Sequence, residues 1–235
     1  MKSQHIKFRI YRYKPGHIDP PRFQNFEVPV EPGMSILDCL EKIRLEQDQT
    51  LMYRHACHHA SCGTCACRIN GQEGLACAQA AGTLGGDVVT LTPLAGLKPI
   101  GDLVVDMRGF YGDFSENWSY LRELDSAEKT RLPAGIRALK RLEDCIECAA
   151  CVSACPVTRE NEAFIGPAAL AALHRELKKH PEKTEALMEK AGGRRGVVRC
   201  EKALHCSRVC PTGVYPARDI ENLRRRLTGN EEKVS

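Results

Sequence analysis

The chain has 235 residues, of which 43% are hydrophobic and 6% aromatic, and its formal net charge is +4. The length allows one large domain or two small ones. The weak basic excess contains no block of five to eight Lys or Arg residues, so we expect no nucleic-acid partner. Thirteen cysteines are the outlier in an otherwise ordinary soluble composition.

The N-terminal segment indicates the cellular compartment of the chain, and the compartment decides whether cysteines form disulfides or bind metal. Met1–Tyr13 alternates apolar and basic side chains, which is typical of a half-buried strand and not of a signal peptide. No segment approaches the roughly 18 apolar residues that a membrane span needs. We therefore expect a cytosolic, reduced chain, in which cysteine clusters indicate metal or redox chemistry and not disulfides.

The first part of the chain carries strand signals around one helix. The strands are expected at residues 7–13, 26–30, 65–69, 74–77, 88–91 and 103–105. Ser35–Asp38 predicts the capped start of a helix that carries Ile36, Leu37, Leu40, Ile43 and Leu45. Lys14–Pro21 is expected to form a turn, and Asn70-Gly71 predicts a two-residue hairpin turn. This order of elements is the outline of a small β-grasp domain.

The rest of the chain lacks alternation and predicts helices. These are expected at residues 117–124, 133–142, 167–179, 184–190 and 216–227. Six cysteines lie in the first 77 residues and seven between 145 and 210, with none between, so the cysteines mark two modules. We predict an α+β protein, with a β-grasp domain over residues 1–106 and an all-α domain over residues 107–235.

The first cysteine set has the spacing of a plant-type ferredoxin. Cys57-x4-Cys62-x2-Cys65 is followed by Cys77, and this pattern predicts the four ligands of a 2Fe-2S cluster. Small residues between these cysteines would let backbone N–H groups approach the sulfides, and the hairpin would return Cys77 to the site.

Two other metal sites compete for this set. A zinc site would also take four cysteines, but the spacing is not the paired CxxC of a zinc ribbon. A Rieske-type site would need two histidine ligands, and His55, His58 and His59 are expected instead to face solvent or to tune the cluster. Cys39 and Cys67 are expected to be core residues and not ligands.

The second and third sets follow the bacterial ferredoxin pattern. Cys145-x2-Cys148-x2-Cys151-x3-Cys155-Pro156 is the full run, and the fourth cysteine of such a run ligates the other cluster. The partner run is Cys200-x5-Cys206-x3-Cys210-Pro211, in which Ala203 stands at the second position.

This exchange assigns the ligands of two further clusters. Cys145, Cys148, Cys151 and Cys210 give four thiolates, which fit a 4Fe-4S cluster. Cys155, Cys200 and Cys206 give only three, which favours a 3Fe-4S cluster. The alternative is a 4Fe-4S cluster whose fourth iron takes water or another side chain, with His205 close in sequence.

A chain with three clusters would conduct electrons without holding an organic substrate. The sequence contains no dinucleotide fingerprint, no Walker A motif and no Gly-x-Ser-x-Gly elbow. We therefore expect no catalytic residue in this chain, and partners at both ends of the electron path.

Three cysteine sets in this order resemble the iron–sulfur subunit of the succinate dehydrogenase/fumarate reductase family over nearly the whole chain. Supporting segments are Leu103–Met107, Phe164–Ala168 and Cys210–Val214. The resemblance implies a flavoprotein partner that binds FAD and the dicarboxylate, and membrane anchor subunits that help form a quinone site. It also implies a place on the cytoplasmic face of the cell membrane and a role in the tricarboxylic acid cycle or anaerobic respiration.

The resemblance also places Pro156 and Arg224 where family members approach the quinone. Two positions depart from the family: Glu160 stands where many members have Trp, and Glu201 where many have His. The direction of catalysis and the quinone type stay open. The same three clusters could also serve a related flavoprotein with another substrate, and a zinc-binding interaction protein is the remaining alternative.

Overall fold

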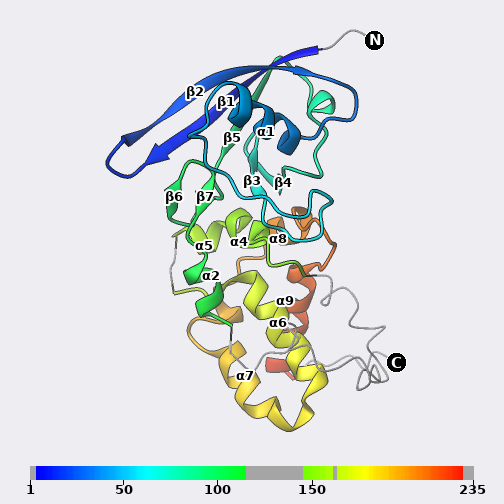
Figure 1. Cartoon of the computed structure of the whole chain (residues 1–235). Coiled ribbons are helices and arrows are strands. Elements are labelled where there is room, and N and C mark those ends of the chain that lie inside the picture. The colour runs from blue at the N-terminus through cyan, green and yellow to red at the C-terminus, as the bar shows by residue number, and fades with distance from the viewer. Residues whose placement is uncertain (1–3, 115–144, 161–162, 230–235) are drawn as a thin grey trace, which may run out of the picture. The chain divides into compact units, whose positions relative to one another are not determined.

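The structure, a computed structural model, describes residues 4–114, 145–160 and 163–229 (Figure 1). Contacts divide the chain into two units. Unit 1 contains Met1–Met107 and Ile146–Ala154, and unit 2 contains Arg108–Cys145 and Cys155–Ser235. The helices expected at 117–124 and 133–142 lie outside the described residues.

Unit 1 is built on a five-stranded mixed sheet in the order β2-β1-β5-β3-β4. β1 pairs antiparallel with β2 and parallel with β5, while β3 pairs antiparallel with β5 and β4. The strands are β1 (Gln4–Lys14), β2 (Ile18–Val30), β3 (Ala66–Ile69), β4 (Gln72–Leu75) and β5 (Val88–Thr92). A second sheet pairs β6 (Pro99–Gly101) with β7 (Val104–Val105). The predicted α+β class, with a sheet domain first, is confirmed.

Helix α1 (Ile36–Glu46) lies against this sheet (Figure 1). Ser35 Oγ accepts a hydrogen bond from Asp38 N at 3.1 Å, and Asp38 Oδ2 accepts one from Ser35 N at 2.8 Å, so the predicted cap is confirmed. Cys39 is fully buried in the core, as predicted. Leu45 also lies on this helix, as predicted, but it is 76% exposed because it lies on the opposite side of the helix from Ile36.

Two hairpins of the five-stranded sheet can be compared with the sequence. The segment predicted as a long turn, Lys14–Pro21, is mostly strand, since β2 begins at Ile18. β2 is an edge strand, where prolines remove no ladder hydrogen bond. The Asn70-Gly71 turn between β3 and β4 is confirmed, with φ of 49° and 84°.

The segment Ile146–Ala154, which carries α4 (Ala150–Ala154), returns to unit 1. Ile146 and Cys148 pack against the core of this unit. Ser153 Oγ accepts a hydrogen bond from Ala95 N at 2.7 Å and donates one to Glu73 Oε1 at 2.8 Å. The sequence predicted one domain over residues 107–235 and did not reveal a return of residues 146–154 to unit 1.

The described elements of unit 2 are helical. They are α2 (Arg108–Gly112), α5 (Pro156–Glu160), α6 (Gly166–Lys179), α7 (Thr184–Gly192), α8 (His205–Arg208) and α9 (Pro216–Leu227), with short 3-10 turns at Pro181–Lys183 and Val197–Arg199. The helices predicted at 167–179, 184–190 and 216–227 are confirmed. α6 packs on α9 around Leu170, Leu173 and Ile220, and His174 Nδ1 lies 2.9 Å from Asp219 Oδ1. None of the described helices is both long and apolar enough to span a bilayer.

A buried arginine links the segments of unit 1. Arg12 is 1% exposed. Its guanidinium contacts Gln24 Oε1 at 2.6 Å, Asp48 Oδ2 at 2.6 Å, Thr50 Oγ1 at 2.9 Å and Asp102 Oδ2 at 3.1 Å. Asp102 in turn accepts hydrogen bonds from the backbone of Tyr13 and Met52. Arg12 therefore holds β1, the segment after α1 and the segment before β7 together.

We expect Arg12→Met to destabilise the protein by about 3–5 kcal/mol, because it leaves Asp48 and Asp102 without their buried counter-charge. The measurement is chemical denaturation followed by circular dichroism. Arg9→Met is the matched control, since Arg9 is exposed and lies over the Phe23 ring at 4.1 Å, and it should cost about 1 kcal/mol or less. Equal effects of the two substitutions would contradict the role given to Arg12.

Candidate iron–sulfur centres

The structure brings the four cysteines of the first set together within unit 1. Cys57 and Cys62 lie on the loop before β3, Cys65 lies directly before β3, and Cys77 follows β4. The β3–β4 hairpin returns Cys77 so that its Sγ lies 3.4 Å from Cys65 Sγ. Ala60 N donates to Cys77 Sγ at 3.2 Å. This convergence fits the predicted 2Fe-2S ligand set.

Backbone N–H groups surround the first sulfur of this set. Cys57 Sγ accepts hydrogen bonds from the amides of His59, Ser61 and Cys62 at 3.5, 3.2 and 3.3 Å. These bonds, the one from His59 first, lower the pKa of Cys57 to about 6. A loop with its amides aimed at one sulfur favours the thiolate, which is the form that binds iron.

Two further cysteines of this region are buried thiols. Burial raises the pKa of Cys65 to about 12, and the neighbouring Cys77 and Cys62 add to the shift. Thiolates held this close repel one another, and a bound metal cation offsets that repulsion. A thiol that coordinates a metal is therefore deprotonated. Burial also raises the pKa of Cys67 to about 12, but its side chain lies in the core of unit 1. That Cys67 is not a ligand stays a prediction.

The loop of the first set touches the loop of the second set. Gly63 has φ +69°, and a Cβ placed on it would lie 2.6 Å from Ile146 O and 2.8 Å from Cys148 Cβ. Only a residue without a side chain allows this approach. Cys148, a predicted 4Fe-4S ligand, therefore lies directly against the predicted 2Fe-2S loop, a proximity that the sequence spacing did not reveal.

The remaining cysteines of the second set are described within their own units. Cys148 and Cys151 lie in unit 1, and Cys145 and Cys210 lie in unit 2. Cys145 and Cys210 pack against the same pair of buried residues, Ala171 and Val214. Val214 N donates to Cys210 Sγ at 3.3 Å, which supplies an amide to that sulfur as well.

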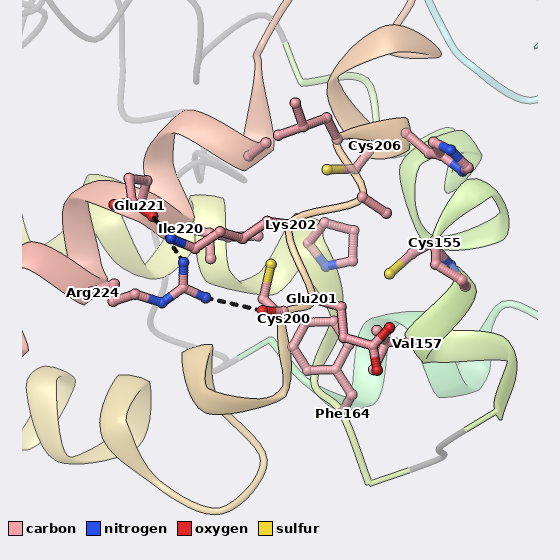
Figure 2. A pocket seen from close by; sticks show the side chains of 16 residues that line it. Cys155, Val157, Phe164, Cys200, Glu201, Lys202, Cys206, Ile220, Glu221 and Arg224 are labelled. Carbon is pink, nitrogen blue, oxygen red and sulfur yellow. Dashed lines mark hydrogen bonds and ion pairs between the residues drawn. The ribbon is translucent and has the colours of Figure 1, made fainter.

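The three cysteines of the third set line one pocket of unit 2, with a volume of about 240 Å³. Figure 2 shows the sulfur atoms of Cys155, Cys200 and Cys206 around this pocket. Burial raises the pKa of Cys206 to about 11, and the charges of the nearby Cys155 and Cys200 raise it further. Ala203 lines the same pocket, so a methyl group stands among three thiols. His205 also lines it, so the fourth-ligand alternative stays open.

The backbone conformation supports Ala203 as the position equivalent to Cys148 in the repeated cysteine pattern. Residues two and four positions after Cys145 are Glu147 and Ala149, with φ of 53° and 58°. The residues at the same offsets after Cys200 are Lys202 and Leu204, with φ of 59° and 63°. Such values are uncommon for residues other than glycine. The two loops therefore share one turn pattern, in which Ala203 occupies the place of a cysteine.

Arg224, which is predicted to approach a quinone, makes hydrogen bonds to the third ligand loop. Its Nη2 donates to the carbonyl oxygens of Val197 and Cys200 at 3.1 and 3.0 Å, and its Nη1 donates to Glu221 at 2.8 Å. These contacts, drawn in part in Figure 2, place a cation beside the Cys200 backbone. Pro156 and Arg224 both line the pocket, but their contact with a quinone stays a prediction.

Comparison with known proteins bears on the identity of these centres. A family model described as a 2Fe-2S iron-sulfur cluster binding domain matches residues 7–112, and one described as a 4Fe-4S dicluster domain matches residues 141–214. A chain of the Mycobacterium smegmatis Sdh1 complex in the apo form is 24% identical, with a TM-score of 0.78, and the match covers 99% of this chain and 100% of that one. A hypothetical protein from Helicobacter pylori is 16% identical, with a TM-score of 0.63, and the match covers 100% of this chain and 42% of that one.

The chain is therefore an iron–sulfur electron-transfer protein that joins a 2Fe-2S cluster binding domain to a 4Fe-4S dicluster domain. It shares its fold, along its whole length, with the Sdh1 chain. The predicted order of a 2Fe-2S domain before a dicluster domain is thus confirmed, and the fold agrees with the resemblance stated from the sequence.

The contact at Gly63 yields a prediction. Gly63→Ala should lower the iron content per chain, because the added Cβ meets Ile146 O and Cys148 Cβ. Gly33→Ala is the matched control: Gly33 also has positive φ, +91°, but open space around it, so it should cost only about 1–2 kcal/mol of backbone strain. The measurement is iron per purified chain together with the denaturation midpoint. Equal iron content in the two variants would contradict the close approach.

Proposed function

We propose that this chain is the electron-transfer subunit of a succinate dehydrogenase/fumarate reductase complex. It passes electrons between the FAD of a flavoprotein subunit and a membrane quinone, through 2Fe-2S, 4Fe-4S and 3Fe-4S clusters. The dicarboxylate site lies on the flavoprotein, and membrane anchor subunits hold the chain at the cytoplasmic face of the membrane. The fold shared with a chain of an Sdh1 complex supports this assignment.

The observation that carries the proposal is the contact between the first two ligand loops. Gly63 of the first loop lies against Cys148 of the second. The helix turn that holds Cys151 continues directly into Cys155, the first ligand of the third set. When bound, the clusters supply one-electron carriers whose potentials depend on net charge and on hydrogen bonds to sulfur.

The protein's own groups set those conditions at each end of the path. At Cys57, three amides stabilise the sulfur charge. At the third set, one thiolate fewer and the Arg224 guanidinium beside Cys200 both reduce negative charge, which favours a higher potential. This gradient suits a third cluster at the quinone end, with Pro156 and Arg224 as the proposed quinone-side residues.

The test uses the complex of this chain with its flavoprotein and anchor subunits. Succinate should reduce the first and third clusters, as seen by electron paramagnetic resonance, and a quinone analogue should reoxidise them. Clusters that dithionite reduces but succinate and fumarate leave unchanged would overturn the substrate assignment and favour the same chain serving another flavoprotein. A colourless, zinc-containing protein would overturn the electron-transfer function itself.

The pocket at Ala203 gives a separate prediction. Ala203→Cys should supply a fourth thiolate, convert the 3Fe-4S cluster to 4Fe-4S and lower its potential. The measurement is the signal of the oxidised three-iron cluster, which should disappear. Ala203→Ser is the control, because serine has nearly the same size as cysteine but lacks the thiolate. This variant should keep the three-iron signal. A three-iron signal that survives in Ala203→Cys would contradict the ligand assignment.

A further inference from the structure

Three metal-binding side chains meet beside the first cysteine loop, and none of them belongs to a cysteine set. Glu41 lies on α1, and His55 and His58 lie on the segment that leads into and past Cys57. His55 Nδ1 lies 3.1 Å from His58 Nε2 and 3.4 Å from Glu41 Oε1. His58 Nε2 lies 3.5 Å from the same carboxylate oxygen. The three atoms form a nearly equilateral triangle.

The size of this triangle matches one face of a zinc tetrahedron. Zinc binds histidine nitrogen at about 2.0–2.1 Å and carboxylate oxygen at about 2.0–2.2 Å, so two ligand atoms at the tetrahedral angle are about 3.3–3.5 Å apart. Two imidazoles and one carboxylate are a donor set that zinc uses, and they leave a fourth position for water. Magnesium and calcium prefer oxygen ligands, so this donor set does not suit them.

The surroundings hold the three side chains in place. The ring of Tyr53 packs on that of His55 with 5.4 Å between centroids, and the ring of His55 meets that of His58 edge-on at 5.3 Å. His58 has φ +61°, a left-handed conformation that histidine adopts more readily than most other side chains. The neighbouring cation, Arg44, lies over the Tyr53 ring at 5.9 Å.

The site is open to an ion from solution. The side chains of Glu41, His55 and His58 are 32%, 35% and 39% exposed. Without an ion, a hydrogen bond between the two imidazoles and the contacts of both rings with the Glu41 carboxylate hold the three groups together. One divalent cation satisfies all three at once.

We propose that Glu41, His55 and His58 bind one Zn²⁺ ion, with water at the fourth position. The ion ties α1 to the loop that carries Cys57, and so restrains the ligand loop of the first cluster. This site is separate from the iron–sulfur ligands, and the zinc ion would bind whatever the identity of the dicarboxylate or the quinone.

The test is a zinc titration of the cluster-loaded chain, followed by calorimetry and by metal analysis after dialysis. Full iron content keeps the cluster cysteines from capturing zinc. The variants are Glu41→Gln, His55→Gln and His58→Asn, the last because asparagine tolerates positive φ. His59→Gln is the matched control, since His59 lies on the same loop outside the triangle.

The wild type and His59→Gln should bind one zinc per chain, and each of the other three variants should bind at least tenfold more weakly. No zinc beyond background in the wild type, or equal affinity in all variants, would overturn the site. The second readout is the rate at which the visible absorption of the 2Fe-2S cluster bleaches in air. Zinc should slow bleaching in the wild type and the control but not in the ligand variants, and bleaching that zinc leaves unchanged would overturn the restraint on the loop.

Discussion

The structure depends on holding several thiolates within a few ångströms of one another against their mutual repulsion. The chain meets this constraint with tight loops in which non-glycine residues adopt positive φ: His58 and Ala60 in the first loop, Glu147 and Ala149 in the second, Lys202 and Leu204 in the third. Each such residue costs on the order of 1–3 kcal/mol. In the first loop the compensating interaction is visible, because the backbone amides point at Cys57. Bound iron would provide the remaining stabilisation.

Packed secondary structure and two arginines fix the positions of these loops. The β3–β4 hairpin sets the distance between Cys65 and Cys77, and the packed pair α6 and α9 carries the walls of the third pocket. Arg12 joins the strands of unit 1 to the segment that precedes the first loop. Arg224 does the same for Cys200 in unit 2. Arg12 thus fixes the segment before the first ligand loop, and Arg224 fixes the backbone of the third ligand loop.

The sequence predicted the parts of this arrangement that depend on local spacing. Cysteine intervals, the Ser35 cap and the Asn70-Gly71 turn are short-range signals, and the structure agrees with the cap and the turn and gathers the first and third cysteine sets. What depends on distant contacts was not predictable. The return of Ile146–Ala154 to unit 1 depends on such contacts, and its approach to Gly63 joins residues more than eighty positions apart. The hydrogen bond from Arg224 to Cys200 O was not predictable either, because an arginine on a helix has many possible partners.

The central claim is that eleven cysteines form three distinct clusters along one path. Iron and sulfide analysis of the purified, reconstituted chain, with electron paramagnetic resonance in oxidised and reduced states, tests it most directly. We predict about nine irons per chain, a three-iron signal when oxidised, and a 2Fe-2S signal when reduced. A chain with about ten irons and no three-iron signal, or with zinc in place of iron, would contradict this claim.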